Sequence, residues 1–189
     1  MFNYAVIDLE STGLQIGFDE ILTAHIVLTD GINFIDEKSF NFKPDKIRTD
    51  YHLAYEVHRI GIEQATKFNG KRESLNDLLA FVPDNSVMVC HAKKIGHYFD
   101  YAFLFMEIEL YLDKRLDFYK KFNHCISTHT LSKKFTKLKK RGLKSVSEYY
   151  GVVLDNHHNA KSDTHACYEI FKKMYKENRN EIEERINIF

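Results

Sequence analysis

The chain has 189 residues, of which 44% are hydrophobic and 29% charged, with 27 basic side chains against 27 acidic ones. This length and composition are typical of one globular domain, and a net charge of zero excludes a uniformly basic nucleic-acid-binding protein. Three widely spaced cysteines, Cys90, Cys125 and Cys167, form no disulfide framework and predict a reducing, cytoplasmic setting. Asp8 and Glu10 interrupt the first apolar run, and no run approaches the roughly 20 residues of a membrane span. We therefore expect neither a signal peptide nor a membrane partner.

The first predicted element is a buried strand that begins at Tyr4 and ends in an acidic pair, Asp8 and Glu10. Residues two apart share one face of a strand, so the two carboxylates point the same way. Carboxylates forced together repel, and each is costly to keep charged away from water. Two interpretations are open for this pair. A divalent cation binds between the two side chains, or the strand end frays and exposes both to solvent.

Residues 21–29 and 32–42 predict two further strands, joined by a hairpin at Asp30 and Gly31. With the first strand they form an antiparallel meander. Residues 45–70 predict a loop with short helices. Ser74 is expected to cap a helix that runs through Phe81, and residues 83–85 predict a turn.

The second half predicts alternating strands and helices. A buried strand over 86–91 precedes a helix over 99–116, and a short strand over 123–128 follows, in which Ser127 or Thr128 caps the next helix. A short helix over 143–150 ends at Gly151, and a long helix covers 162–178. The predicted fold is therefore α/β, with one domain over 1–178 and a charged C-terminal tail or helix over 179–189.

Two further carboxylates fall on the buried face of a predicted helix. Asp163 precedes Ala166 by three residues and Ile170 by seven, and Asp100 precedes Phe103 by three. A carboxylate on a core face needs a partner or a metal ion. The alternative is an acid favoured at a helix start by the helix dipole.

His158 lies five residues before Asp163, in a short segment that leads into the last helix. Histidine titrates near neutral pH, so His158 is a candidate general base. A lone loop histidine is also commonly a solvated surface residue, and we expect this of its neighbour His157.

These residues resemble the motifs of the DEDDh (DnaQ-like) 3′–5′ exonuclease family, which includes the proofreading exonuclease subunits of DNA polymerase III. Residues 8–14, D-L-E-S-T-G-L, match the first motif, D-x-E-[TS]-T-G-[LF]. Residues 158–163, H-N-A-K-S-D, match the third, H-x-A-x-x-D. Phe99 and Asp100 fit the core of the second motif, and residues 57–61 resemble the family's H-G-I segment. The resemblance spans about residues 3–175.

The resemblance implies an RNase H-like fold, in which helices flank a five-stranded mixed sheet of three antiparallel and two parallel strands. It also implies two Mg²⁺ or Mn²⁺ ions and the release of nucleoside 5′-monophosphates from a nucleic-acid 3′ end. The implied metal ligands are Asp8, Glu10, Asp100 and Asp163, and the implied general base is His158.

The implied substrate contacts lie around the first and second motifs. By analogy with the family, Thr12 and Leu14 touch the 3′-terminal nucleotide, and Phe99 lines the same pocket. Separately, residues 133–144 hold seven Lys or Arg, including Lys139, Lys140 and Arg141. We expect these three to track phosphates, although such a run is also commonly a solvated face.

The chain departs from the family pattern before Asp100. The second motif often reads H-N-x-x-F-D, whereas about four extra residues separate His91 from Phe99 here, so either His91 or His97 is its counterpart. Two other classes are open as alternatives: a zinc site built from the histidines and cysteines at 90–97 and 124–125, which fits no standard spacing, and a non-catalytic nucleic-acid or replicase-binding module. We expect single-stranded DNA as the substrate, with RNA as the alternative. The sequence leaves open a DNA polymerase subunit as partner and the oligomeric state.

Overall fold

The computed structural model describes residues 3–93, 98–155 and 157–187 and contains one five-stranded mixed sheet. The strands are β1 (Tyr4–Ser11), β2 (Ile21–Thr29), β3 (Phe34–Asn41), β4 (Ser86–Cys90) and β5 (Phe122–Ser127), in the order β3-β2-β1-β4-β5. Strands β1, β2 and β3 are antiparallel to one another, and β4 and β5 run parallel to β1. This confirms the predicted fold, including the meander and the parallel half.

The alternation of side chains along β1 explains why both faces of the sheet are covered. Ala5, Ile7 and Leu9 face one side and join a core formed with α3 (Lys71–Phe81), α4 (Phe99–Leu112) and α5 (Arg115–Lys121). Tyr4 and Val6 face the other side, against α6 (Thr128–Phe135), α7 (Leu143–Tyr150) and α8 (Ala160–Asn187). Asp8 and Glu10 continue this second row, so their carboxylates point to the α8 side.

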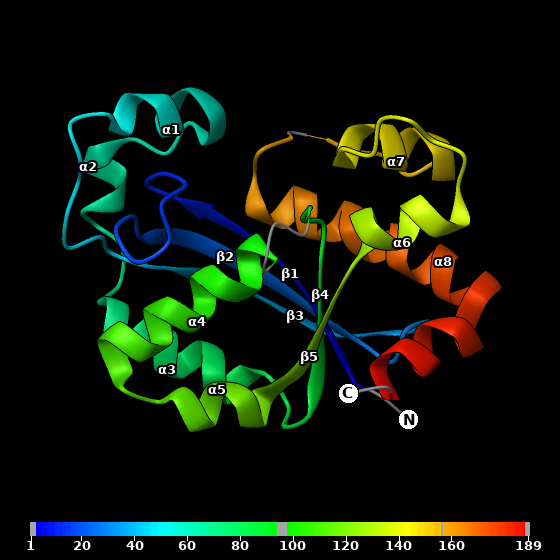
Figure 1. Cartoon of the computed structure of the whole chain (residues 1–189). Coiled ribbons are helices and arrows are strands. Elements are labelled where there is room, and N and C mark those ends of the chain that lie inside the picture. The colour runs from blue at the N-terminus through cyan, green and yellow to red at the C-terminus, as the bar shows by residue number, and fades with distance from the viewer. Residues whose placement is uncertain (1–2, 94–97, 156, 188–189) are drawn as a thin grey trace.

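Two short helices, α1 (Tyr51–His58) and α2 (Ile62–Ala65), lie in the region predicted as a loop with short helices. In Figure 1 they stand at the same end of the sheet as the beginning of α8, near the end of β1. The structure therefore gathers α1, the end of β1 and the start of α8 around one region.

The predicted helix over 99–116 is wrong in its length. Helix α4 ends at Leu112, because Asp113 adopts a left-handed conformation with φ of 55°. A separate helix, α5, begins at Arg115. Asp tolerates this conformation better than most residues. After the break, Phe118 of α5 packs in the core on the same face of the sheet as α3 and α4.

The predicted cap at Ser74 is also wrong. Helix α3 begins at Lys71, after Gly70, and the Ser74 hydroxyl instead donates a hydrogen bond of 2.8 Å to the carbonyl of Asn41. Lys71 is buried between Glu20 and Glu107, and its Nζ lies 3.2 Å from Glu107 Oε2. A charged residue is stable at this position because both partners are buried with it.

The C-terminal helices follow the prediction closely. Helix α7 ends at Gly151, whose φ of 60° fits a glycine cap, and Ser127 accepts a hydrogen bond of 3.2 Å from the His129 N–H at the start of α6. Helix α8 has a kink at Asn178 and continues to Asn187, with Ile182 in the core. Among the helices of the described residues, none combines the length and apolar character of a membrane span.

Candidate active site

Three carboxylates from two elements meet beside the carboxyl end of β1. Asp8 and Glu10 come from β1, and Asp163 comes from the first turn of α8. One oxygen of each lies within 4.8 Å of the others. Glu10 and Asp163 are buried and Asp8 is half-buried. The strand end does not fray, because Glu10 remains paired with Thr23 of β2.

Asp100 approaches the same group from the opposite side of the sheet. It lies in the first turn of α4 and is buried. The backbone N–H of Leu9 and the thiol of Cys90 donate hydrogen bonds to its carboxylate. These donors hold Asp100 against the ends of β1 and β4.

Burial and mutual repulsion oppose the ionisation of all four carboxyl groups at once. Burial raises the pKa of Asp8 well above its usual range, and the charges of Asp100, Asp163 and Glu10 raise it further. Burial, followed by Asp163 and Asp100, raises the pKa of Glu10 to about 7. Burial also raises the pKa of Asp100 to about 6, although its hydrogen-bond donors oppose the rise. Such mutual repulsion is what a bound cation relieves.

Both histidines before α8 reach Asp163. His157 is exposed, as predicted for a surface residue, but it is more than solvated, since its Nδ1 lies 3.0 Å from the Asp163 carboxylate. His158 donates its backbone N–H to the same carboxylate at 3.0 Å, with a left-handed φ of 69°. The two rings stack with centroids 3.9 Å apart. Burial lowers the pKa of His158, so its ring is neutral near pH 7.

A cavity of about 510 Å³ opens beside the carboxylates, between the chain that follows β1 and helix α1. Its lining includes Glu10, His158, Phe99, Leu14 and Leu53. Leu14 is 82% exposed at the rim. The cavity therefore combines apolar side chains with Glu10, one member of the carboxylate group.

Thr12 also lines this cavity, but its hydroxyl is used inside the protein. It accepts the Glu20 N–H at 2.9 Å and donates to Asp19 at 3.3 Å. Gly13 lies so close to Asp19 that a Cβ would come within 2.4 Å of its carboxylate, so only glycine fits there. The segment that carries Leu14 is thus held in one shape.

His58 belongs to this site and was not among the predicted site residues. Its Nδ1 accepts the Ile60 N–H at 3.0 Å, so its Nε2 carries the proton and donates to the Ser11 carbonyl at 3.2 Å. It lines the 510 Å³ cavity together with His158. The sequence signal was the resemblance of residues 57–61 to the family's H-G-I segment.

The basic segment lies next to the site, outside its lining. Lys139 and Lys140 are exposed in the connection between α6 and α7, and Arg141 is half-buried. The following residues, Gly142 and Leu143, line a cavity of about 360 Å³ with Asp8, Glu10 and Asp163. The predicted phosphate-tracking role stays a prediction.

His91 is held by structural hydrogen bonds, at 2.8 Å to the Thr128 hydroxyl and 2.9 Å to the Arg141 carbonyl. Burial lowers its pKa to about 4. His97 lies outside the described residues, so the choice between the two remains open. The alternative zinc site is not assembled among the described residues. Cys90 and Cys125 lie 4.0 Å apart, but no metal-binding group formed by residues 3–93, 98–155 and 157–187 includes either of them.

A model of the RNase T exonuclease family matches residues 5–171. The chain belongs to this exonuclease family. The predicted DnaQ-like relationship is thereby confirmed. The structure agrees, since E. coli exonuclease I in complex with a dT13 oligonucleotide superposes with a TM-score of 0.83 at 14% identity, covering 97% of this chain and 43% of that one.

The exonuclease domain also resembles parts of larger polymerases. It is 30% identical over 171 residues to DNA polymerase III PolC-type of Thermotoga maritima, and 30% identical over 192 residues to that of Staphylococcus aureus. The chain spans about an eighth of these relatives, since the matches cover 12% of each. A further fold neighbour, with a TM-score of 0.71 and 15% identity over 93% of this chain and 82% of that one, is a 3′-exonuclease described in 3′-end recognition of the histone mRNA stem-loop.

Proposed function

We propose that the chain is a 3′–5′ exonuclease that hydrolyses the terminal phosphodiester bond of single-stranded DNA and releases nucleoside 5′-monophosphates. The observation that supports this most is the meeting of Asp8, Glu10 and Asp163 within 4.8 Å. Asp100 lies close enough to raise the pKa of Asp8. An acidic group of this kind is costly to the fold and is explained by the chemistry it performs.

The donor set fits two hard divalent cations, Mg²⁺ or Mn²⁺. All four proposed ligands are carboxylates, and oxygen donors are those that Mg²⁺ and Mn²⁺ prefer. The raised pKa values of Asp8, Glu10 and Asp100 fit the same assignment, because bound cations neutralise the repulsion that raises them. Metal ions held there supply Lewis-acid activation of water and stabilise charge on the phosphate.

His158 is the proposed general base. His158 lines the 360 Å³ cavity together with Glu10 and Asp163, and its imidazole is neutral. A ring nitrogen would accept the proton of the attacking water. His157 holds the Asp163 carboxylate from the side at 3.0 Å. Asp163 is thereby fixed by one side chain and one backbone N–H.

The 3′-terminal nucleotide is proposed to bind in the 510 Å³ cavity. Its volume falls within the usual range of small-ligand pockets. Leu14 and Phe99 offer apolar surface for the base in the cavity that Glu10 also lines. Lys139, Lys140 and Arg141 would attract the phosphates that follow along the strand.

Single-stranded DNA is the substrate favoured by the relatives. The matched polymerases are DNA polymerases, and the exonuclease I neighbour is in complex with dT13. A polymerase partner and a cytoplasmic location belong to the same proposal. RNA is the second candidate, because the histone mRNA 3′-exonuclease shares the fold.

The test is digestion of 5′-labelled single-stranded DNA and RNA in parallel, with Mg²⁺. The proposal predicts a ladder that shortens from the 3′ end, faster on DNA, and no ladder with Asp163→Ala. A faster ladder on RNA would reassign the substrate. If wild type gives no ladder, or Asp163→Ala gives the same ladder, the proposed exonuclease activity is refuted.

A further inference from the structure

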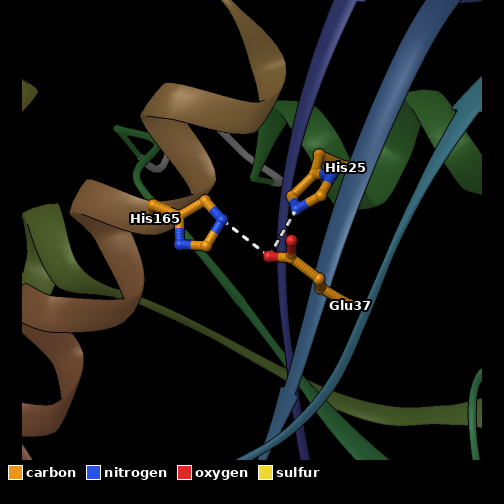
Figure 2. A group of neighbouring side chains, drawn as sticks. All are labelled: His25, Glu37 and His165. Atoms are coloured by element: carbon orange, nitrogen blue, oxygen red, sulfur yellow. Dashed lines mark hydrogen bonds and ion pairs between the residues drawn. The ribbon is translucent and has the colours of Figure 1, made fainter. Parts of the chain in front are cut away.

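A second group of metal-binding side chains lies outside the carboxylate group. His25 of β2, Glu37 of β3 and His165 of α8 point toward one another, as Figure 2 shows. The His165 Nε2 lies 2.6 Å from Glu37 Oε2, and the His25 Nε2 lies 3.3 Å from the same oxygen. One donor atom of each residue lies within 4.8 Å of the others.

The hydrogen bond of His25 prepares its Nε2 as a ligand. Its Nδ1 lies 2.7 Å from the Ser39 hydroxyl, on the far side of the ring from Glu37. A proton on Nδ1, donated to Ser39, leaves the Nε2 lone pair directed at the centre of the group. His25 is 1% exposed, so its ring cannot turn freely out to solvent.

We propose that His25, Glu37 and His165 bind one zinc ion, with water as the fourth ligand. Two imidazoles and one carboxylate suit Zn²⁺, which binds nitrogen and oxygen donors in a tetrahedral arrangement. The donor set differs from that of Asp8, Glu10 and Asp163, which offer only oxygen and favour Mg²⁺ or Mn²⁺. The same set of two imidazoles and one carboxylate recurs at His157, His158 and Asp163, so a test of the proposed site must keep zinc out of that group.

The proposed site joins three elements next to the carboxylate group. His165 follows Asp163 by two residues in the first turns of α8, and His25 pairs with Asp8 in the register of β1 and β2. Zinc held there would tie the beginning of α8 to strands β2 and β3. Its role is to fix the helix that carries Asp163.

Lys161 competes with the cation. Its Nζ lies 2.9 Å from Glu37 Oε1, whereas both histidines contact Oε2, and the Lys161 side chain is 57% exposed. A long exposed lysine can swing into solvent when a cation binds. Removing the charge of Lys161 should therefore tighten zinc binding. If these residues form only ion pairs with one another, removing that charge should not increase their affinity for zinc.

The test uses metal-stripped protein in an Asp8→Asn, Asp163→Asn background, which weakens metal binding at the carboxylate group and removes the carboxylate from the group of His157, His158 and Asp163. Zn²⁺ affinity is measured by competition with a chromophoric chelator, and Co²⁺ is added as a spectroscopic substitute. The variants are His165→Gln, Ser39→Ala and Lys161→Ala. The matched control is His52→Gln, which removes an exposed histidine of α1. Circular dichroism checks that each variant is folded.

The proposal predicts one tight Zn²⁺ equivalent, and the intense visible absorption that four-coordinate Co²⁺ gives. His165→Gln should abolish both, and Ser39→Ala should weaken Zn²⁺ binding about tenfold or more, as loss of an outer partner does. Lys161→Ala should tighten it, and His52→Gln should leave it unchanged. No tight equivalent in the parent, or an equivalent that survives His165→Gln in a folded protein, would overturn the proposal.

Discussion

Glu10 makes the metal-free protein less stable as pH rises, and Glu10→Gln should remove this effect. The pKa of Glu10 is about 7 in the folded protein, against 4.5 for the free side chain. A carboxyl whose pKa is raised by folding binds its proton more tightly in the folded state. Protonation therefore favours folding, and stability is lost as pH rises from about 4.5 to about 7.

The magnitude follows from the two pKa values. Each pKa unit corresponds to about 1.4 kcal/mol, so the rise from 4.5 to about 7 costs the folded state about 3.5 kcal/mol above pH 7. Glutamine keeps the shape of the side chain without its charge. Glu10→Gln should thus raise the free energy of unfolding by up to about 3.5 kcal/mol at pH 8, and by close to zero at pH 4.

The assay is urea unfolding in the presence of EDTA, at several pH values between 4 and 8, with the denaturant slope checked for constancy. Glu148→Gln, at an exposed position of α7, is the control and should change stability by less than about 0.5 kcal/mol at every pH. A Glu10→Gln effect that is independent of pH, or destabilising at pH 8, would refute the repulsion argument. Added Mg²⁺ should stabilise wild type more than Glu10→Gln, because a ligand of the folded state stabilises it by mass action.

Three further predictions concern other parts of the molecule. His158→Ala should lower the nuclease rate by about 10² to 10⁴, measured as single-turnover digestion, while Mg²⁺ still raises the melting temperature; loss of that rise would make His158 a ligand. Lys71→Ala should lower the free energy of unfolding by about 3–5 kcal/mol, measured by urea unfolding, because it leaves the buried Glu20 carboxylate without its positively charged partner. A smaller loss of stability would mean that water replaces the lysine ammonium. Replacing Lys139 and Lys140 with Gln should reduce the slope of log affinity against log salt by about 1.4 for a single strand, and an unchanged slope would exclude both from the phosphate path.

Local patterns predicted the sheet well because each strand carries its own signal. The bounds of β2, residues 21–29, agree with the prediction, as do those of α7 with its Gly151 cap. The carboxylates were found because acids stood where the period of a strand or helix demanded apolar residues. Carboxylates at these core-facing positions destabilise the fold, and the proposed metal-dependent hydrolysis gives the reason for their presence.

Contacts that depend on backbone detail could not be predicted. The sequence places His157 and His158 side by side, but it predicts neither the left-handed φ of His158 nor the contact of both residues with Asp163. Likewise, the end of α4 depends on one residue, Asp113, within a segment of suitable helix composition.

The His25, Glu37 and His165 group is a different case. Its members come from three separate elements, and only the sheet register and the rotation of α8 bring them together. None of the three stands out in its own segment. Spacing along the chain therefore carries no signal for this site, in contrast to residues 158–163.

The most direct test of the proposed active site is the release of nucleoside 5′-monophosphates from a single strand, measured by mass spectrometry with Mg²⁺ for wild type, Asp8→Asn and Asp155→Asn. Asp155 is an exposed acid in the segment before α8 and serves as the matched control. We predict that wild type and Asp155→Asn release monophosphates at equal rates and that Asp8→Asn releases none. Equal release by Asp8→Asn, or the absence of release by wild type, would contradict the assignment of the carboxylate group as a nuclease centre.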